Sequence, residues 1–345
     1  MTARATTLLR YTGDKEQKIV AVEENRLRQG QHPDPLAPDA QPPDPATLAP
    51  GWVSALASRE MERYRAALAL PDQPDVRAAI LDDLSAYYQM DRDECVRRCL
   101  DWESWSVEEW RERDRSTESG LRDFYNTTHS WSFDLAWYAY LQAEGYVYPT
   151  SVAVSQLLGP PDRAPRCLDF GSGVGDAAQL LVELGYTVDL ADVSQTLLAF
   201  ARWRLERRGQ QAGYIDLNDA TVPPHTYDAI LAKDVLAHVP NFGETVTMLH
   251  RALRPGGLLI TNFDTRPPSP ENAWHLYSDD LPLRRALQDI GFEQAGAVDG
   301  YLMVYRRVPP AGLAHIVRRA RNAVMFGPPR RAYRHGKALV RSLRH

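Results

Sequence analysis

An aspartate and three glycines at alternate positions form the stretch of this sequence whose residue types and spacing point most directly to chemistry. The stretch RCLDFGSGVGDAAQLL, residues 166–181, places Asp169 ahead of Gly171, Gly173 and Gly175. The apolar residues before the glycines predict a short strand, and those after them predict the start of a helix. A strand, a glycine-rich turn and a helix present backbone N–H groups and a helix N-terminus to a ligand. The stretch therefore predicts a site for a nucleoside-containing cofactor.

The spacing of these glycines separates two classes of cofactor. The dinucleotide fingerprint G-x-G-x-x-G fits Gly171 and Gly173, but Asp176 stands where its third glycine should be. The order is instead D-x-G-x-G-x-G, which resembles motif I of the class I S-adenosylmethionine (SAM) dependent methyltransferases. In that family the glycines pass under the methionine part of SAM, and the acid helps to hold its amino group. A dinucleotide site is the weaker interpretation.

A second acid follows the next predicted strand. The strand over 187–191 ends at Asp192, which lies 23 residues after Asp169. Ligands of an open parallel sheet bind outside the carboxyl ends of its strands, so Asp192 is expected to face the same ligand. A carboxylate in this place can accept both ribose hydroxyls, and Val193 lies beside it.

The third strand, 213–216, is followed by Asp216 and Leu217. The resemblance implies that the acid here accepts from the adenine amino group and that the next backbone N–H donates to the ring. Asn218 and Asp219 are the near alternatives, because this strand is short.

Two more segments resemble motifs of the family. They are LAKDVLAHVPN at 231–241, similar to the motif IV region, and LRPGG at 253–257, similar to the turn before the fifth strand. The resemblance covers about residues 160–308. The cofactor-binding residues that it and the strand ends predict are Asp169, Gly171, Ser172, Gly173, Asp192, Val193, Asp216, Leu217 and Lys233.

Methyl transfer requires the acceptor, the methyl group and the sulfur to be in line, and sometimes a base. His129, His238 and His275 are the candidate bases, because histidine titrates near neutral pH. His238 lies in the motif IV-like segment, where a structural hydrogen bond near the cofactor is the alternative role. His275 lies in a proline-rich segment after the fifth predicted strand.

An aromatic segment precedes the cofactor motifs. Residues 121–141 predict one long helix or two broken ones, and polar residues interrupt the aromatic pattern at 126–129. Packing alone is one explanation. The other is a wall of the substrate pocket, for which Tyr125, Asn126, Trp131 and Tyr138 are the candidates, with an aromatic ring stacked on the sulfonium.

The elements that must position these residues alternate regularly. Strands are predicted at 167–170, 187–191, 213–216, 227–232 and 258–262, with helices between them, and Asp299-Gly300 predicts a hairpin that joins the last two strands, 295–298 and 301–308. The predicted fold is α/β, a seven-stranded, mostly parallel Rossmann-like methyltransferase sheet with an N-terminal helical cap domain. The expected divisions are a disordered proline-rich segment at 1–50, a helical cap and substrate region at 51–160, a SAM-binding Rossmann-like domain at 161–309 and a basic helical tail at 310–345.

Composition limits the function classes further. The chain has 345 residues, a net charge of −5 and three cysteines, and its tail from 311 carries nine Lys or Arg and no acid. No run approaches the ~18 apolar residues of a membrane span and no signal-peptide core is present, so a cytoplasmic protein is expected. We expect neither a metal site nor nucleic acid as a partner. A dimer and membrane contact by the basic tail are both left open, with packing of the tail favoured.

These features favour a SAM-dependent methyltransferase that transfers a methyl group to O, N or C of a small molecule in specialised metabolism. The first alternative is other chemistry on the same fold, such as intramolecular cyclisation of SAM to azetidine-2-carboxylate with release of methylthioadenosine. The second alternative is a non-catalytic SAM-binding partner protein.

Overall fold

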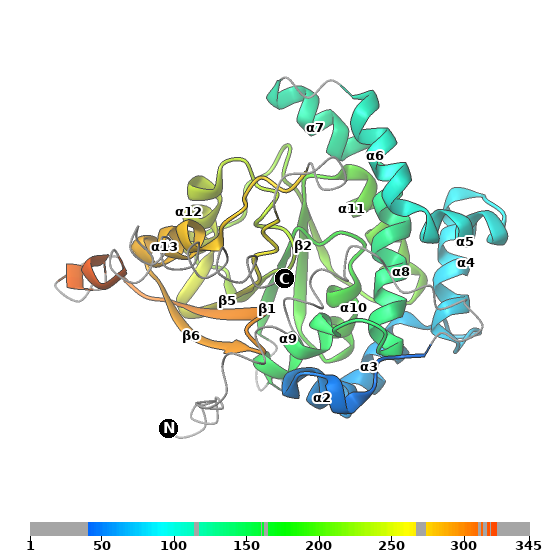
Figure 1. The fold of residues 1–345 in the computed structure, drawn as a ribbon, viewed down its shortest axis with the longest axis horizontal. Helices are drawn as coiled ribbons and strands as arrows, with labels where there is room; N and C mark the ends of the chain where they lie inside the picture. The colour runs from blue at the N-terminus through cyan, green and yellow to red at the C-terminus, as the bar shows by residue number, and fades with distance from the viewer. Residues whose placement is uncertain are drawn as a thin grey trace, which may run out of the picture.

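The core of the molecule is a twisted sheet of seven strands (Figure 1). The structure, a computed structural model, describes residues 41–113, 117–159, 161, 165–266, 274–309, 312, 316–317 and 319–322. The strands are β1 Arg166–Phe170, β2 Thr187–Asp192, β3 Gly213–Asp216, β4 Tyr227–Ala232, β5 Leu253–Thr261, β6 Phe292–Val298 and β7 Leu302–Arg307. Their order in the sheet is β3-β2-β1-β4-β5-β7-β6. β1 to β5 pair in parallel and β7 is antiparallel to both of its neighbours, which confirms the predicted fold class.

Helices cover both faces of the sheet, which explains why the central strands are apolar on both sides. Cys167 of β1 belongs to the core under α9 (Thr150–Leu158), α10 (Asp176–Glu183) and α11 (Gln195–Arg207). Its neighbour Leu168 belongs to the core under α12 (Phe242–Ala252) and α13 (Asp280–Ile290), on the opposite face. Successive side chains of a strand point to opposite faces, and Figure 1 shows the two groups of helices on either side.

Strand β5 begins earlier than the sequence predicts. Its start at Leu253 takes in the Pro255–Gly257 stretch that we expected to be a turn outside the strand. The pairing with β4 shifts between Tyr227 and Ala229, so these residues form an irregularity within the ladder, with Gly256 at φ +78°. The expected change of direction is therefore a bulge inside the strand.

The N-terminal region is helical as predicted. Its elements are the 3₁₀ turn η1 Pro45–Thr47 and the α-helices α2 Pro50–Leu56, α3 Arg59–Leu68, α4 Val76–Tyr88, α5 Arg92–Leu100, α6 Trp102–Glu112, α7 Glu118–Thr127 and α8 Ser130–Glu144. The aromatic segment is thus two helices, α7 and α8, which Thr128 and His129 separate. Figure 1 shows α6 and α7 beyond one end of the sheet. The cap starts within the segment expected to be disordered, of which residues 1–40 lie outside the described part of the chain.

A buried acid anchors the cap to the sheet domain. Asp83 of α4 is fully buried, and its carboxylate lies 3.1 Å from Arg204, 2.9 Å from Arg207 and 2.8 Å from Arg208, all at the end of α11. A buried carboxylate without partners would be strongly destabilising, so this cluster requires α4 and α11 to stay together.

The β6–β7 hairpin provides a second link between distant parts of the chain. Its turn residues Asp299 and Gly300 both have positive φ, +51° and +68°, as the predicted two-residue turn requires. The Asp299 carboxylate also accepts hydrogen bonds from the backbone N–H groups of Gly51 and Trp52, each at 3.0 Å. These two donors belong to the first turn of α2, where backbone N–H groups have no partner within the helix.

Most of the basic tail lies outside the described residues. Residues 316–317 and 319–322 are helical, and the side chains of Ile316 and Val317 are exposed. Among the helices that the structure describes, none combines the length and the apolar character needed to cross a membrane.

Candidate functional site

The loop between β1 and α10 has the form that a close ligand requires. Gly171, Gly173 and Gly175 adopt φ values of +67°, +53° and +75°. A Cβ at Gly171 would lie 2.3 Å from Cγ2 of Val235, and one at Gly173 would lie 2.8 Å from Cδ1 of Leu135. Both the backbone and the available space therefore demand glycine at the first two positions.

The carboxylate of Asp192 is joined to this loop through main-chain donors. Its Oδ2 accepts from the Gly173 N–H at 2.9 Å and its Oδ1 accepts from the Ser194 N–H at 2.8 Å. Burial raises the pKa of Asp192, although these backbone hydrogen bonds favour its charged form. Each carboxylate oxygen keeps further acceptor capacity, so the group is held in place and can still bind a diol.

Asp169, near the end of β1, has a buried carboxylate oxygen that forms no hydrogen bond. Its Oδ2 is buried without a hydrogen bond, and so is Oγ of Ser172 in the loop. Burial raises the pKa of Asp169 to about 7, with Asp176 and Asp192 adding to the effect and Lys233 opposing it. A buried carboxylate with an unpartnered oxygen matches a cationic amino group, which is what the methionine part of SAM carries.

Lys233 directly follows β4 and joins a polar network around Asp176. Its Nζ donates to Oγ of Ser151 at 2.6 Å and lies 3.5 Å from the carboxylate of Asp176. Asp176 also accepts from Ser151 at 2.6 Å and from the hydroxyl of Tyr64 at 2.9 Å. Tyr64, Ser151 and Asp176 were not among the site residues predicted from the sequence. The aspartate in place of the third fingerprint glycine was the signal that could have revealed the network.

The end of β3 is arranged differently from the expectation. The backbone N–H of Leu217 donates to the carbonyl of Asp192 at 3.0 Å, so it is not free to bind an adenine ring. Asp216 accepts from the Asn218 N–H at 2.9 Å and from Nε2 of Gln195 at 2.7 Å. These hydrogen bonds lower the pKa of Asp216, although its partial burial acts in the opposite direction. The predicted role of Leu217 is therefore corrected, since the sheet already uses its donor.

Asn126 contacts residues that follow β2 and β3, although we expected it in the substrate wall. Its Oδ1 accepts from the Gln195 N–H and from Nδ2 of Asn218, each at 3.2 Å, and its carbonyl accepts from the hydroxyl of Thr196 at 2.5 Å. These three partners belong to the segments that follow β2 and β3. The C-terminal end of α7 is thus fastened across the ends of those strands, next to Val193, whose side chain is partly exposed.

The aromatic candidates come from α7 and α8. Burial raises the pKa of Tyr125, and the charge of Asp192 adds to this effect. The ring of Trp131 lies 5.3 Å from that of Tyr125 and 6.2 Å from that of Trp274, which follows β5. Burial and then Asp234 raise the pKa of Tyr138, so this residue faces the end of β4.

Side chains hold Asp234, the residue that follows Lys233. It adopts φ +50°, which is uncommon outside glycine. Its carboxylate accepts from the hydroxyl of Tyr301 at 2.9 Å and from Nδ2 of Asn262, while Asn262 Oδ1 accepts from the Asp234 N–H at 2.7 Å. Burial raises the pKa of Asp234, and Asp264 adds to that effect. The sequence analysis did not identify Asn262 or Tyr301, because nothing in the local pattern marks them.

The structure brings together two of the three candidate histidines. The rings of His238 and His275 lie 4.5 Å apart in an edge-on arrangement. Nδ1 of His238 lies 2.9 Å from the carbonyl of Trp274, and burial together with His275 lowers the pKa of His238 to about 4. His129 is not part of this group, because it is exposed at the start of α8 and its ring packs edge-on against Tyr88 at 5.7 Å.

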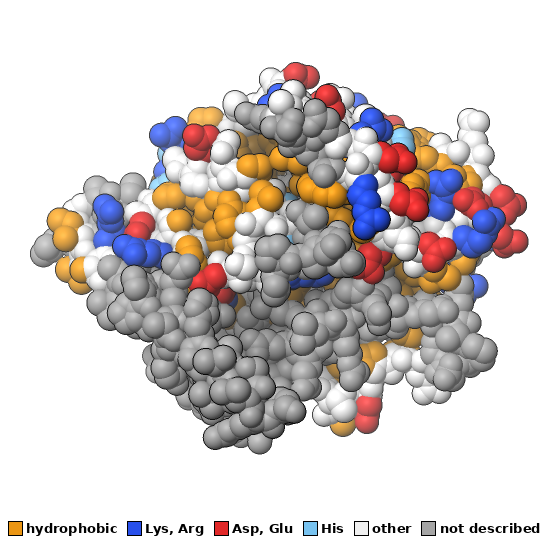
Figure 2. All heavy atoms as spheres, turned by 45° about the horizontal axis from the view of Figure 1, so that its top comes forward, with side chains coloured by type: hydrophobic (Ala, Val, Ile, Leu, Met, Phe, Trp, Pro, Cys, Tyr) orange, Lys and Arg blue, Asp and Glu red, His pale blue; other side chains and the backbone are white. Residues whose placement is uncertain are grey.

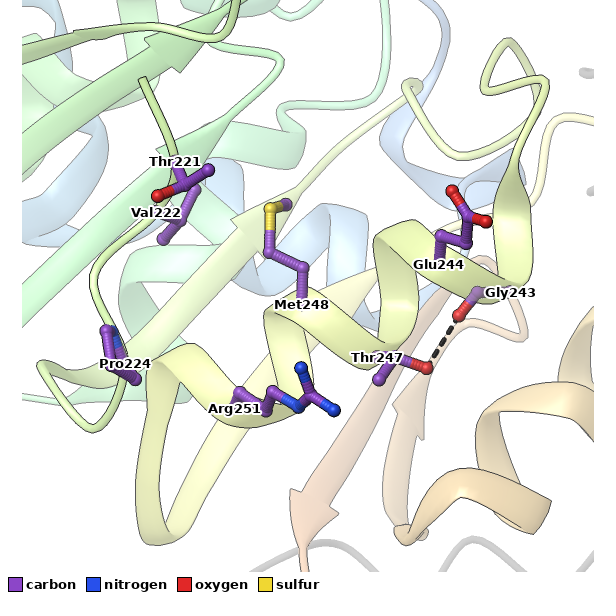
Figure 3. Close-up of a pocket in the computed structure, with 8 residues that line it drawn as sticks. All are labelled: Thr221, Val222, Pro224, Gly243, Glu244, Thr247, Met248 and Arg251. Atoms are coloured by element: carbon purple, nitrogen blue, oxygen red, sulfur yellow. Dashed lines mark hydrogen bonds between the residues drawn. The ribbon is translucent and has the colours of Figure 1, made fainter.

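A groove on the outside of the sheet domain lies apart from these residues. It runs along α12 opposite the connection between β3 and β4 and encloses about 700 Å³ (Figure 3). None of the predicted site residues lines it. The lining residues are Thr221, Val222, Pro224, Gly243, Glu244, Thr247, Met248 and Arg251. Within the described residues, no group of three or more His, Cys, Asp or Glu side chains is placed to hold a metal ion.

Parts of this chain are similar to known proteins. Residues 143–295 match the model of a family described as a methyltransferase domain. Phosphoethanolamine N-methyltransferase 2 of Caenorhabditis elegans is 26% identical over 152 residues, which are 41% of this chain and 35% of that protein. The fatty-acid O-methyltransferase of Mycolicibacterium smegmatis is 30% identical over 175 residues, which are 49% of this chain and 61% of that protein. The chain thus spans less than two thirds of the length of either relative.

A solved structure similar to this one is phosphoethanolamine N-methyltransferase 2 of Haemonchus contortus in complex with SAM. The similarity covers 51% of this chain and 46% of that one, at 22% identity and a TM-score of 0.41. The family match includes α10 and the strands β1 to β5, with the glycine loop and the acids that surround it. Residues 143–295 of this chain are thus similar to a methyltransferase domain.

Proposed function

We propose that this protein binds SAM at the carboxyl ends of β1 and β2 and methylates an O, N or C atom of a small molecule. The observation that carries the proposal is the glycine loop at 171–175 between two buried carboxylates, Asp169 and Asp192. The three glycines give the loop its positive φ values, and the two acids match the amino and ribose ends of SAM.

The residues of the chain would divide the work of holding the cofactor. Asp169 would bind the amino group through its unpartnered oxygen, and Asp192, fixed by Gly173 and Ser194, would bind the ribose. Tyr125, beside Asp192, would cover the ligand from the cap. Bound SAM supplies an electrophilic methyl group. The protein then has to align the acceptor, keep water out and remove a proton where the acceptor carries one.

The helices of the cap support the proposal that the acceptor is a small molecule. Helices α7 and α8 lie over the ends of the strands, and Asn126 fastens α7 to the segments after β2 and β3. On the face that Figure 2 shows, basic and acidic side chains are interspersed among hydrophobic ones, which gives no support to nucleic acid as the substrate. A role in specialised metabolism, a cytoplasmic location and the four-part division of the chain are parts of the same proposal.

The test is titration calorimetry with SAM and S-adenosylhomocysteine, followed by product analysis with a panel of acceptors. We expect binding of both ligands and acceptor-dependent formation of S-adenosylhomocysteine. Methylthioadenosine formed from SAM alone would support the cyclisation of SAM instead. Binding of SAM without any product would support a non-catalytic partner, and the absence of binding would contradict the proposal as a whole.

A further inference from the structure

The two clustered histidines differ in what their ring nitrogens contact. We infer that His275 is the base that takes a proton from the acceptor, that Asp264 and Arg266 are its positioning residues, and that the acceptor is a neutral compound with a hydroxyl of the phenol type. This inference rests on the proposed function, because it assigns roles on the acceptor side of the same cleft.

The geometry around His275 is that of an oriented imidazole. Its Nε2 lies 3.5 Å from Oδ2 of Asp264, and its Nδ1 is buried without any hydrogen-bond partner. A carboxylate next to Nε2 favours the tautomer that carries the proton there, which leaves a lone pair on Nδ1. A buried acceptor atom without a partner calls for a donor, and the hydroxyl of a bound acceptor is such a donor.

Arg266 fixes the carboxylate that orients the histidine. The Arg266 guanidinium donates to both oxygens of Asp264, with Nε at 3.1 Å from each and Nη2 at 2.6 Å from Oδ2. Burial alone would raise the pKa of Asp264, but His275 and Arg266 hold it well below its usual range. Asp264 therefore stays charged and cannot compete with His275 for the proton of the acceptor.

His238 has a different place in the cluster. Its Nδ1 is engaged with the carbonyl of Trp274, the residue next to His275 in the chain. Its ring packs against His275, and burial keeps it neutral near physiological pH, since its pKa is lowered to about 4. We therefore assign to His238 a positioning role: it holds the segment that carries His275. Because His238 is uncharged, it does not repel a proton on His275.

The charges at this end of the cleft argue against an anionic acceptor. Two acids, Asp234 and Asp264, lie at this end. Among the described residues, the cation beside them is Arg266, and it already forms an ion pair with Asp264. Lys233, further toward the cofactor, is engaged with Ser151 and Asp176. A phosphate group would therefore meet carboxylates without a free cation to pair with.

Aromatic side chains border the same residues. Trp274 precedes His275, and its ring lies 6.2 Å from Trp131 and 6.1 Å from Trp110. These rings meet edge-on, an arrangement that an aromatic ligand can join, and a base is useful where the attacking atom loses a proton. Together these two features favour a phenol-type hydroxyl over an amine that is already nucleophilic.

In the proposed step, each bond that forms is matched by one that breaks. As the acceptor oxygen forms a bond to the methyl carbon, its proton passes to Nδ1 of His275, and the electrons of the methyl–sulfur bond stay on sulfur. The products are the methyl ether and S-adenosylhomocysteine, and the imidazolium returns its proton to water.

The first experiment needs neither SAM nor an acceptor. Nitrogen NMR of the free protein with ¹⁵N-labelled histidine should show His275 at neutral pH with a proton on Nε2 and none on Nδ1; the signals are assigned by their loss in His275→Gln. Asp264→Ala should abolish this preference, Asp264→Glu should restore it, and His129→Gln should leave the His275 signals unchanged. A proton on Nδ1 in the wild type, or an unchanged tautomer in Asp264→Ala, would overturn the roles of His275 and Asp264.

The second experiment tests the acceptor class with 4-nitrophenol, which changes colour on ionisation. Added to the protein with S-adenosylhomocysteine at a slightly acidic pH, it should show about a fivefold larger nitrophenolate fraction in the wild type than in His275→Gln. The same fraction in both proteins would overturn the phenol-type acceptor. Failure of the proposed function would appear separately, as a lack of binding of S-adenosylhomocysteine in calorimetry, and the NMR result would still stand.

Discussion

The two parts of the proposed site, for the cofactor and for the acceptor, are held by different kinds of contacts. At the proposed cofactor end, the carboxylate of Asp192 accepts from the backbone N–H groups of Gly173 and Ser194. Asp216 accepts from the backbone N–H of Asn218 and also from the side chains of Gln195 and Asn218. At the acceptor end, side chains hold the carboxylates of Asp234 and Asp264. One of these donors, Tyr301, lies 67 residues after Asp234 in the chain. Main-chain donors are present with any sequence that keeps the fold, whereas side-chain donors disappear with a single substitution.

This difference indicates which end is free to change. A site held by the backbone keeps its shape while the surrounding side chains vary, and it suits a ligand common to a whole family. A site held by side chains can be rebuilt by a few substitutions, and it suits a ligand that differs between members. We therefore expect substitutions at the cofactor end to affect folding and SAM affinity, and substitutions at the acceptor end to affect turnover alone.

The largest effect is expected from Gly171→Val. The new Cβ would lie 2.3 Å from Val235 at φ +67°, so strain and overlap together should cost about 2–5 kcal/mol of stability. Calorimetry should find no SAM binding. Gly209→Val is the matched control, because Gly209 has φ +66° with nothing within 4 Å of its added Cβ. Its free energy of unfolding, measured with denaturant, should fall by only about 1–2 kcal/mol. Equal losses in the two variants would contradict the close packing at the loop.

The next effect contrasts one acid from each end. Asp192→Ala should weaken SAM binding by about 1.5–3 kcal/mol, because the ribose loses hydrogen bonds to a charged group. Asp234→Asn should leave SAM affinity within about 0.5 kcal/mol and lower turnover with an acceptor. Calorimetry on the two variants would settle the contrast, and a similar loss of affinity in both would mean that the ends are not separate.

The pH dependence of stability should reveal Asp169. The pKa of this acid is raised from 3.8 to about 7 in the folded chain, so the folded state binds more protons than the unfolded state between these values. Its contribution to the free energy of unfolding is thus present below pH ~4 and is lost as the pH rises toward 7, by up to about 4 kcal/mol. Asp169→Asn should flatten the profile in that window. Parallel unfolding profiles of variant and wild type would show that the acid ionises normally.

The smallest effect is expected at the contact between the cap and the cofactor end. Asn126→Ala removes the acceptor for Gln195 N–H and Asn218, which should lower stability by about 0.5–1.5 kcal/mol and weaken the hydrogen-exchange protection of α7. Thr127→Ala is the control, because the Thr127 hydroxyl donates within α7, to the Asp123 carbonyl. Equal exchange in both variants would mean that Asn126 does not fasten the helix.

The sequence predicted the sheet domain closely, because each strand and the glycine loop are marked by residues within the element itself. β3 and β4 have the predicted bounds, and the glycine loop and Asp192 lie where the strand ends placed them. The start of β5 was missed because its bulge depends on a shift in the pairing with β4, which only the neighbouring strand reveals. Hydrophobic periodicity reports on one element at a time, so it cannot show such a shift.

The acceptor end could be predicted only in part. His238 and His275 were candidates, but their contact depends on how the segment after β5 folds back on the end of β4. His129 was a candidate for the same role, but its position in the aromatic segment did not reveal that it is exposed at the start of α8. Asn262 and Tyr301 carry no local signal, and their role follows from the antiparallel placement of β7.

The hydrogen bonds from Gly51 and Trp52 to Asp299 have a consequence for protein synthesis. The cap helices leave the ribosome first, but the acid that completes the first turn of α2 is made almost 250 residues later. During translation the first turn of α2 therefore lacks these two acceptor contacts until the β6–β7 hairpin has formed. A nascent chain stopped before residue 299 should show proteolytic cleavage near α2, and a chain released after that point should resist it.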